Sequence, residues 1–162
     1  MSFSEWRSYK LREVAKYTTG KLNSNAAVEN GVYPFFTCSP QTLKIDNYSF
    51  DQDAVILAGN NANGVFAIKH FKGKFNAYQR TYVITTKDDR IVDNKFLYYA
   101  IGLQLNILQQ LSVGSATKFL TKPILDNINI EVPSDESEMK YIAHILSTLD
   151  DKIEVNNQIK KI

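Results

Sequence analysis

The segment 134–162 carries the most regular pattern in this 162-residue chain, and it restricts the possible folds more than any other feature. Its side chains recur at spacings of 3, 4, 3, 4 and 3 residues, at Met139, Ile142, Leu146, Leu149, Ile153 and Asn156. This spacing gives a narrow stripe, which is typical of a coiled coil. Asp135 can cap the helix, with Glu138 three residues later. The pattern predicts a long C-terminal helix that pairs with a second helix through this stripe.

The alternative is a helix that folds back on its own domain. About 28 helical residues span roughly 42 Å at 1.5 Å per residue, which is more than a domain of about 130 residues needs to cover itself. Asn156 lies on the stripe, where a buried amide is satisfied only opposite a polar partner and so selects one register. Helix length and Asn156 therefore favour self-association, with the six residues of the stripe as the dimer interface.

Residues 1–133 precede this helix and are enough to bury one hydrophobic core. The chain is 44% hydrophobic, and Cys38 is its single cysteine, which favours a reducing compartment. No apolar run approaches the length of a membrane span, and no basic and then apolar segment resembles a secretion signal. We expect a cytoplasmic protein without membrane association, with one domain over 1–133 and a helical appendage over 134–162.

Local patterns within the domain alternate between strands and helices. Runs of β-branched and aromatic residues, joined by turns with Gly, Asn and Asp, predict strands near 33–37, 54–59, 64–71, 80–86 and 127–133. Helical spacing predicts a short helix within 6–17 and a longer one over 94–112 that Asp93 can cap. The expected fold class is α/β (α+β), with a mixed or antiparallel sheet, flanking helices and the long C-terminal coiled-coil helix.

Positive charge is concentrated in the middle of the chain. Residues 69–122 contain 9 Lys and Arg against 3 Asp and Glu, a net charge of +6, whereas 134–162 contain 4 against 6. A basic body favours a polyanionic partner, and an acidic tail favours a protein partner. A solvated face is the alternative explanation of the basic segment.

Three loops of this body carry side chains that can read DNA. Asn and Gln pair with adenine and Arg with guanine, whereas Lys, Ser and Thr contact phosphates. The candidates for base edges are Asn60, Asn61, Asn63, Gln79 and Arg80. The candidates for phosphates are Lys21, Ser115, Thr117, Lys118 and Lys122. An Asn-rich turn by itself is commonly only a turn, but three such loops together favour base readout, with Gln79 and Arg80 as the strongest pair.

The common enzyme motifs are absent from the sequence, which has no GxxxxGK[ST] phosphate loop, no GxGxxG and no GxSxG. A metal-dependent nuclease remains an alternative, because Asp126, Glu138 and Lys140 could supply the carboxylates and lysine that such enzymes place around Mg²⁺. Glu138 is better used at the start of a helix. We therefore expect no catalytic residue, no metal and no cofactor.

Two further classes stay open. A protein-interaction adaptor would explain the coiled-coil tail, although not the loops rich in Asn, Gln and Arg. A solitary methyltransferase is disfavoured, because the sequence has no cofactor-binding glycine loop and no Pro-Pro motif of amino methylation.

Several stretches carry a family resemblance, in order along the chain. They are WRSYKLREVAKYTTGK, GVYPFF, DAVILAGN, GKFNAYQRTYVI, KFLYYAI and, most strongly, SVGSATKFLTKPILDNINIEVPSDESEMKYIAHILSTLDDKI. The last contains a Gly-Ser-Ala loop, a helix start and a helix with the spacing Leu-x-x-Leu-Asp-x-x-Ile. Nearly the whole chain thus resembles one half of the DNA-specificity subunit of type I restriction–modification systems.

The resemblance implies a target-recognition domain that binds double-stranded DNA, followed by a spacer helix. It implies that chemistry is left to a methyltransferase (modification) subunit and, where present, a restriction (endonuclease and translocase) subunit. Such subunits usually hold two recognition domains and two long helices packed antiparallel, whereas this sequence has one of each. We therefore expect either a natural half-subunit that self-associates or a fragment of a longer subunit.

Overall fold

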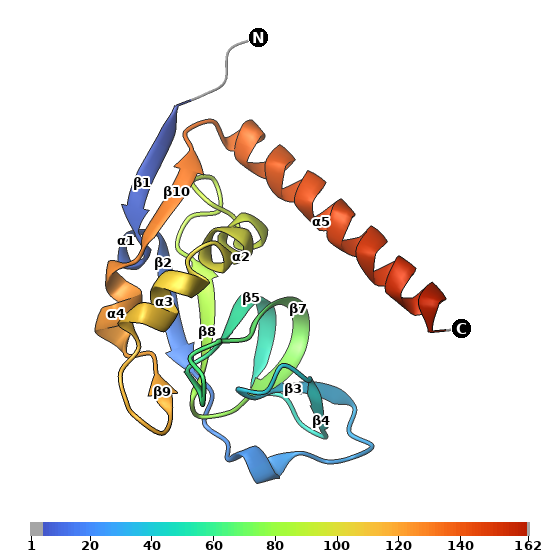
Figure 1. Ribbon diagram of the computed structural model, residues 1–162. Coiled ribbons are helices and arrows are strands. Elements are labelled where there is room, and N and C mark those ends of the chain that lie inside the picture. The colour runs from blue at the N-terminus through green and yellow to red at the C-terminus, as the bar shows by residue number, and fades with distance from the viewer. Residues whose placement is uncertain (1–4, 162) are drawn as a thin grey trace.

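A mixed sheet of six strands forms the centre of the computed structural model, which describes residues 5–161 (Figure 1). The strand order is β2-β8-β5-β7-β3-β4; β3 runs parallel to β7, and the other neighbours are antiparallel. The strands are β2 Ala15–Thr19, β3 Tyr33–Phe36, β4 Leu43–Ile45, β5 Phe50–Ala58, β7 Ile68–Ala77 and β8 Thr81–Thr86. The predicted α/β fold with a mixed sheet is therefore confirmed.

Two short ladders and the helices complete the fold. β1 (Trp6–Lys10) pairs antiparallel with β10 (Asn129–Pro133), and β6 (Asn60–Asn61) pairs antiparallel with β9 (Lys118–Phe119). The helices are α1 Leu11–Val14, the 3₁₀ turn η1 Ser24–Ala26, α2 Asn94–Gly102, α3 Leu105–Leu111, α4 Lys122–Asn127 and α5 Glu136–Lys160. Because β1 and β10 are paired, α5 starts beside the first strand of the chain.

β5 lies in the middle of the sheet, and its apolar run is buried on both faces. Val55 and Leu57 face the larger core, which α2 and the start of α5 also fill. Ala54 and Ile56 face a smaller core that is rich in phenylalanine. Successive side chains of a strand point to opposite faces, so an uninterrupted apolar run is what a sheet covered on both faces requires.

The structure corrects two of the predicted helices. Asp93 caps α2 as expected, since its Oδ1 accepts from the Phe96 amide at 2.8 Å. The helix predicted over 94–112 breaks after Gly102, the residue type with the lowest helix propensity apart from proline. α3 then resumes at a new angle that buries Leu108 completely. Within 6–17 only Leu11–Val14 is helical, because the flanking residues pair with β10 and β8.

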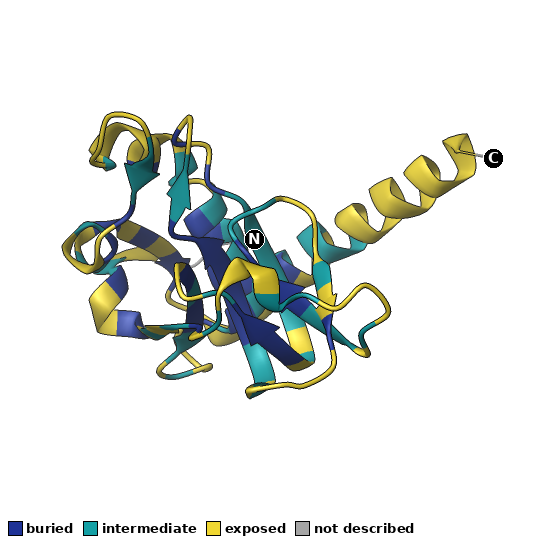
Figure 2. Cartoon of the chain, turned by 90° about the horizontal axis from the view of Figure 1, so that it is seen from below, coloured by how far each residue is buried: buried dark blue, intermediate teal, exposed yellow. Residues whose placement is uncertain are grey.

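The long helix α5 is present as predicted, and its first turns pack on the body. The Asp135 carboxylate caps it by accepting from the Ser137 amide at 2.9 Å. Met139 and Ala143 are fully buried, and Ile142 packs partly buried against the same core. Residues 149–161 are all exposed, and Figures 1 and 2 show this part of the helix projecting away from the body. The first turns of α5 thus fold back on their own domain, and pairing of the exposed part with a second helix stays a prediction.

A tyrosine hydrogen bond holds the middle of α5 to α2. The Tyr99 hydroxyl donates to the Asp150 carboxylate. Burial, together with this hydrogen bond, raises the pKa of Tyr99 above its usual value, so the hydroxyl stays protonated and able to donate at neutral pH. Tyr98 lies edge-on to Tyr99, with ring centroids 4.9 Å apart, and makes no hydrogen bond to Asp150 among the described residues.

Replacing Tyr99 by phenylalanine should loosen α5 without unfolding the body. We expect faster amide hydrogen exchange over residues 144–152, because one hydrogen bond worth about 0.5–1.5 kcal/mol is removed. Tyr98→Phe is the matched control, since it deletes a neighbouring hydroxyl and leaves the Tyr99 contact intact. Equal exchange rates in the two variants would show that the Tyr99 contact does not hold the helix.

Candidate nucleic-acid interface

The three polar loops predicted from the sequence meet at one end of the sheet. Asn60 pairs with Phe119, and Asn61 pairs with Lys118, so the ladder β6–β9 joins the first loop to the third. The Leu120 amide donates to the Gly59 carbonyl at 2.9 Å, and the Gly59 amide donates to the Arg80 carbonyl at 2.8 Å. Backbone hydrogen bonds therefore fasten residues 58–64, 76–82 and 113–122 together.

Two glycines permit this close packing. A Cβ on Gly59 would lie 2.1 Å from the carbonyl oxygen of Arg80, a separation that no real side chain shows. Gly114 has φ of +115°, which side-chain-bearing residues rarely adopt, and a Cβ there would lie 2.1 Å from the Thr117 carbonyl oxygen. Both loops thus need glycine for reasons that the sequence pattern could not reveal.

Between the loops lies a cleft of about 490 Å³, which we call the loop cleft. Its lining residues come from segments that are far apart in the sequence: Thr19, Gly59, Gln79, Arg80, Tyr82, Val113, Phe119, Leu120 and Thr121. Gln79 and Arg80 are exposed at its rim. No pattern in the sequence indicated Thr19, Tyr82 or Phe119, because only the register of β2 against β8 and the β6–β9 ladder bring them together.

The Arg80 side chain lies over an aromatic ring. Its guanidinium carbon lies 5.7 Å from the centroid of the Phe119 ring, a cation–π arrangement. Among residues 5–161, the side-chain N–H groups of Arg80 have no hydrogen-bond partner. A guanidinium stacked on an aromatic ring still has its N–H donors available, and two of them together match an acceptor pair such as guanine O6 and N7.

The asparagines divide into different roles. Asn61 Oδ1 accepts from the amides of Asn63 and Val65, at 2.8 and 3.3 Å, so its oxygen shapes the turn. The Asn63 carbonyl accepts from Gln109 Nε2 at 2.9 Å, which ties this turn to α3. The side chain of Asn60 makes no hydrogen bond to the described residues and is half-buried beside the loop cleft. Asn60 is therefore better placed than Asn61 to contact a ligand.

Four of the five candidate phosphate contacts lie in segments next to the loop cleft, although none of them lines it. Leu22 forms a bridge to Tyr78, which places the exposed Lys21 next to the Gln79 segment. Ser115 and Thr117 lie in the loop that reciprocal Val113–Phe119 hydrogen bonds close, at 3.1 and 2.8 Å. Lys118 Nζ donates to the Gly114 carbonyl at 2.7 Å within this loop.

Lys122 is the exception, because its ammonium is directed to a different group of residues. Its Nζ lies 3.2 Å from both carboxylate oxygens of Asp126 and 5.4 Å from the centroid of the Tyr17 ring. The Tyr17 hydroxyl also donates to Asp126. These hydrogen bonds, the one from Tyr17 foremost, lower the pKa of the Asp126 carboxyl below its usual value, so this carboxylate stays charged.

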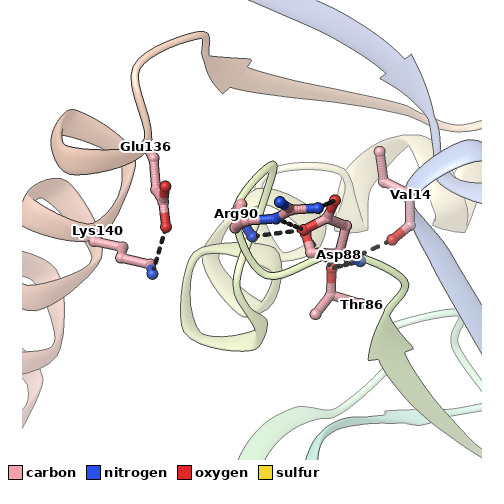
Figure 3. Close-up of polar contacts among 6 residues, drawn as sticks. All are labelled: Val14, Thr86, Asp88, Arg90, Glu136 and Lys140. Atoms are coloured by element: carbon pink, nitrogen blue, oxygen red, sulfur yellow. Dashed lines mark hydrogen bonds and ion pairs between the residues drawn. The ribbon is translucent and has the colours of Figure 1, made fainter.

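The residues of the nuclease alternative do not form a common site. Asp126 is engaged by Tyr17 and Lys122, whereas Lys140 Nζ points to Glu136 Oε1 at 2.8 Å (Figure 3). The length of β10 separates α4, which carries Asp126, from α5, which carries Glu138 and Lys140. Within residues 5–161, no group of His, Cys, Asp and Glu is arranged to hold a metal ion.

The loop that faces the start of α5 is ordered by its own ion pair. Arg90 Nη2 lies 3.0 Å from Asp88 Oδ2, and Thr86 Oγ1 accepts from the Asp88 amide at 3.2 Å (Figure 3). Arg90 is mostly exposed and lies beyond the end of β8 that is opposite to the loop cleft. Its positive charge is therefore compensated locally, unlike that of Arg80.

The stripe of α5 is only partly available to a partner. Met139 was expected in a dimer interface, but its side chain is 0% exposed and belongs to the core of its own domain, which corrects that prediction. Leu146 is half-buried. Leu149 and Ile153 are 51% and 56% exposed, and Asn156 is exposed on the same face. None of the described helices is long and apolar enough to cross a membrane.

Known proteins are similar to this chain over most of its length. Residues 3–162 match the family model described as the type I restriction modification DNA specificity domain. The EcoDI specificity subunit of Escherichia coli is 41% identical over 145 residues, covering 90% of this chain and 31% of the relative. The MjaVIII specificity subunit of Methanocaldococcus jannaschii is 28% identical over 177 residues, covering 97% of this chain and 40% of the relative. The chain thus spans less than half the length of these relatives.

Solved structures have the same fold. The S subunit of a type I restriction–modification system from M. genitalium superposes with a TM-score of 0.82 at 20% identity, covering 93% of this chain and 40% of that one. The HsdS subunit from Thermoanaerobacter tengcongensis gives a TM-score of 0.64 at 16% identity, covering 95% and 39%. Since the family model matches almost every residue and the fold agrees, this chain belongs to the type I restriction modification DNA specificity family.

Proposed function

We propose that this chain recognises a specific sequence in double-stranded DNA and acts as the specificity component of a type I restriction–modification complex. The observation that carries the proposal is the loop cleft, where Gln79 and Arg80 stand at the rim beside Asn60 and Lys118. Base-edge donors and phosphate-binding lysines gathered at one end of a basic domain are what direct readout requires. Family membership supports the same function.

The two parts of the chain divide the work in this proposal. Residues 1–133 form the target-recognition domain, and 134–162 form a spacer and dimerisation helix. The 25 residues of α5 span about 38 Å at 1.5 Å each, which corresponds to about 11 base pairs at 3.4 Å per step. Two domains held one helical turn apart could read a split site from one side of the duplex.

The chain performs no chemistry in this scheme. It places a methyltransferase subunit and, where the system has one, a restriction subunit on the DNA, and it associates with a second copy through Leu149, Ile153 and Asn156. The cytoplasm is the proposed location, which a single cysteine and a DNA substrate favour.

Arg80→Ala tests the proposed readout. We expect it to relax the preference at one base position and to cost about 1–3 kcal/mol in specific binding. Fluorescence anisotropy on a set of duplexes that differ at single positions of the selected site measures this. Arg90→Ala is the matched control, because it removes the same charge where Asp88 compensates it. Equal weakening on every sequence would make Arg80 a phosphate contact, and a wild-type chain that retards no duplex at low salt would favour the adaptor.

A further inference from the structure

A second cavity, of about 230 Å³, is lined by several positively charged side chains, none of which lines the loop cleft. We call it the basic pocket. Four of its lining side chains are cationic and one is acidic, and the complete lining is Arg12, Ala15, Lys16, Tyr17, Lys87, Lys122 and Asp126. The cations come from α1, β2, the residue after β8 and α4. Because these residues come from stretches that are far apart in the sequence, no local pattern predicts that they meet.

One carboxylate faces four cations, so the lining carries a net charge of +3. The Asp126 carboxylate accepts from Lys122 and from the Tyr17 hydroxyl, and its charge also acts on Arg12. Arg12 Nη1 donates to the neutral Asn127 Oδ1 at 2.9 Å, and Lys87 Nζ donates to the Arg12 carbonyl at 2.6 Å. Lys16 is exposed and contacts no polar partner among residues 5–161. Neutral partners position Arg12 and Lys87 without cancelling their charge.

The basic pocket shares a wall with the loop cleft. Tyr17 lines the pocket and Thr19 lines the cleft, two residues apart on one face of β2, which is a separation of roughly 7 Å at about 3.3 Å per residue. The Tyr17 ring lies edge-on to Tyr82 of the cleft, with centroids 6.5 Å apart. Thr121 and Lys122 are consecutive and belong one to each cavity.

We propose that the basic pocket binds backbone phosphates of the DNA strand whose base is read at the loop cleft, about two nucleotides from that base, at roughly 3.4 Å per step along a strand. This inference rests on the proposed function. Lys16, Arg12 and Lys87 supply the charge, and Lys122 is held in place by Asp126. Phosphate contacts of this kind fix the register of a protein on the duplex and carry no sequence information of their own.

The double variant Arg12→Gln and Lys16→Gln tests the pocket in the full chain. Affinity should fall about tenfold or more on every duplex at low salt, and the slope of log K against log salt should flatten by about 1.8, or 0.9 per lost phosphate contact. The preference among base sequences should not change. Lys44→Gln with Lys72→Gln removes the same net charge, Lys44 being on β4 at the opposite edge of the sheet, and should leave the slope close to wild type.

Neutral methylphosphonate linkages, placed one at a time along a duplex selected from a random library, locate the contact. Wild type should lose affinity when the linkage lies about two nucleotides from the base that Arg80→Ala relaxes, and the double variant should be indifferent to it. The inference is overturned if both double variants flatten the slope equally. It is overturned too if Arg12→Gln with Lys16→Gln keeps full DNA affinity but no longer binds the methyltransferase subunit, since the pocket is then a protein surface.

Failure of the underlying function looks different. In that case the wild-type chain binds no duplex at any salt concentration, and Arg80→Ala changes the preference at no base position. If Arg80→Ala relaxes one base and the pocket variants behave like the Lys44 and Lys72 control, DNA recognition stands and only the phosphate site is lost.

Discussion

Substituting Leu149 and Ile153 together by aspartate is expected to abolish the proposed pairing of two copies and to leave a folded monomer. Both side chains are about half exposed in the single chain, and four residues apart on α5 they lie on the same face of the helix. Because only about half of each side chain remains to be buried, packing it against a partner helix stabilises the dimer by about 0.8–1.5 kcal/mol. Four such side chains across a two-fold interface amount to about 3–6 kcal/mol, roughly a 10²- to 10⁴-fold change in association.

Sedimentation velocity gives the association state. Methylome sequencing of cells that also express the methyltransferase subunit gives the DNA motif that is methylated. Wild type should yield a symmetric split motif, and the double variant should yield none. Val155→Asp is the matched control: Val155 is 53% exposed on the same helix, but two residues from Ile153 and so about 200° around it. A double variant that sediments like wild type would refute pairing through this face.

Replacing Gly59 by alanine should remove specific DNA binding almost completely. The new Cβ would meet the Arg80 carbonyl oxygen at 2.1 Å and the edge of the Tyr82 ring at 3.1 Å. Backbone cannot yield as a flexible side chain can, so the 58–64 loop must move away from Arg80 and break the hydrogen bonds that Gly59 makes to Arg80 and Leu120. Overpacking of this kind costs about 1–3 kcal/mol of stability, and the loop cleft loses its shape.

Gly102→Ala is the control for the glycine test. A Cβ at Gly102 has nothing within 4 Å, and the residue ends α2, so the change should leave stability equal or slightly higher. Urea unfolding gives the stability of both variants, and circular dichroism shows what fraction is folded in the binding assay. If Gly59→Ala binds the selected duplex as tightly as Gly102→Ala, the loop cleft is not the reading site.

The sequence patterns predicted those helices and strands that are set by side-chain spacing and propensity over a few residues. The strands around 54–59 and 80–86 and the capped helix at Asp93 follow from spacing and propensity, which act over a few residues. The break after Gly102 was missed, because a periodic pattern continues across it and the change of direction is set by the burial of Leu108. Tertiary packing overrode the local signal at that point.

In the candidate site, the sequence likewise predicted which loops take part but not what each residue in them does. The three loops were chosen for side chains that can bind bases and phosphates, and the structure brings those loops to one cleft. The individual roles were not predictable: the Asn61 oxygen is used by its own turn, and Lys122 points to Asp126. Hydrogen bonds among neighbours decide such roles, and they depend on contacts between segments that are distant in the sequence.

The mixed α/β body, the long final helix and the kinds of side chain in the loops can be inferred from the sequence, because periodicity, capping and composition are properties of short segments. That Met139 is core and Ile153 is surface depends on packing in three dimensions, since one face of α5 is divided between its own domain and solvent. Only the tertiary structure brings Arg12, Lys16, Lys87 and Lys122 together at one pocket. The register of β2 on β8 and the packing of α1 against α4 create that meeting, and no pattern along the chain encodes it.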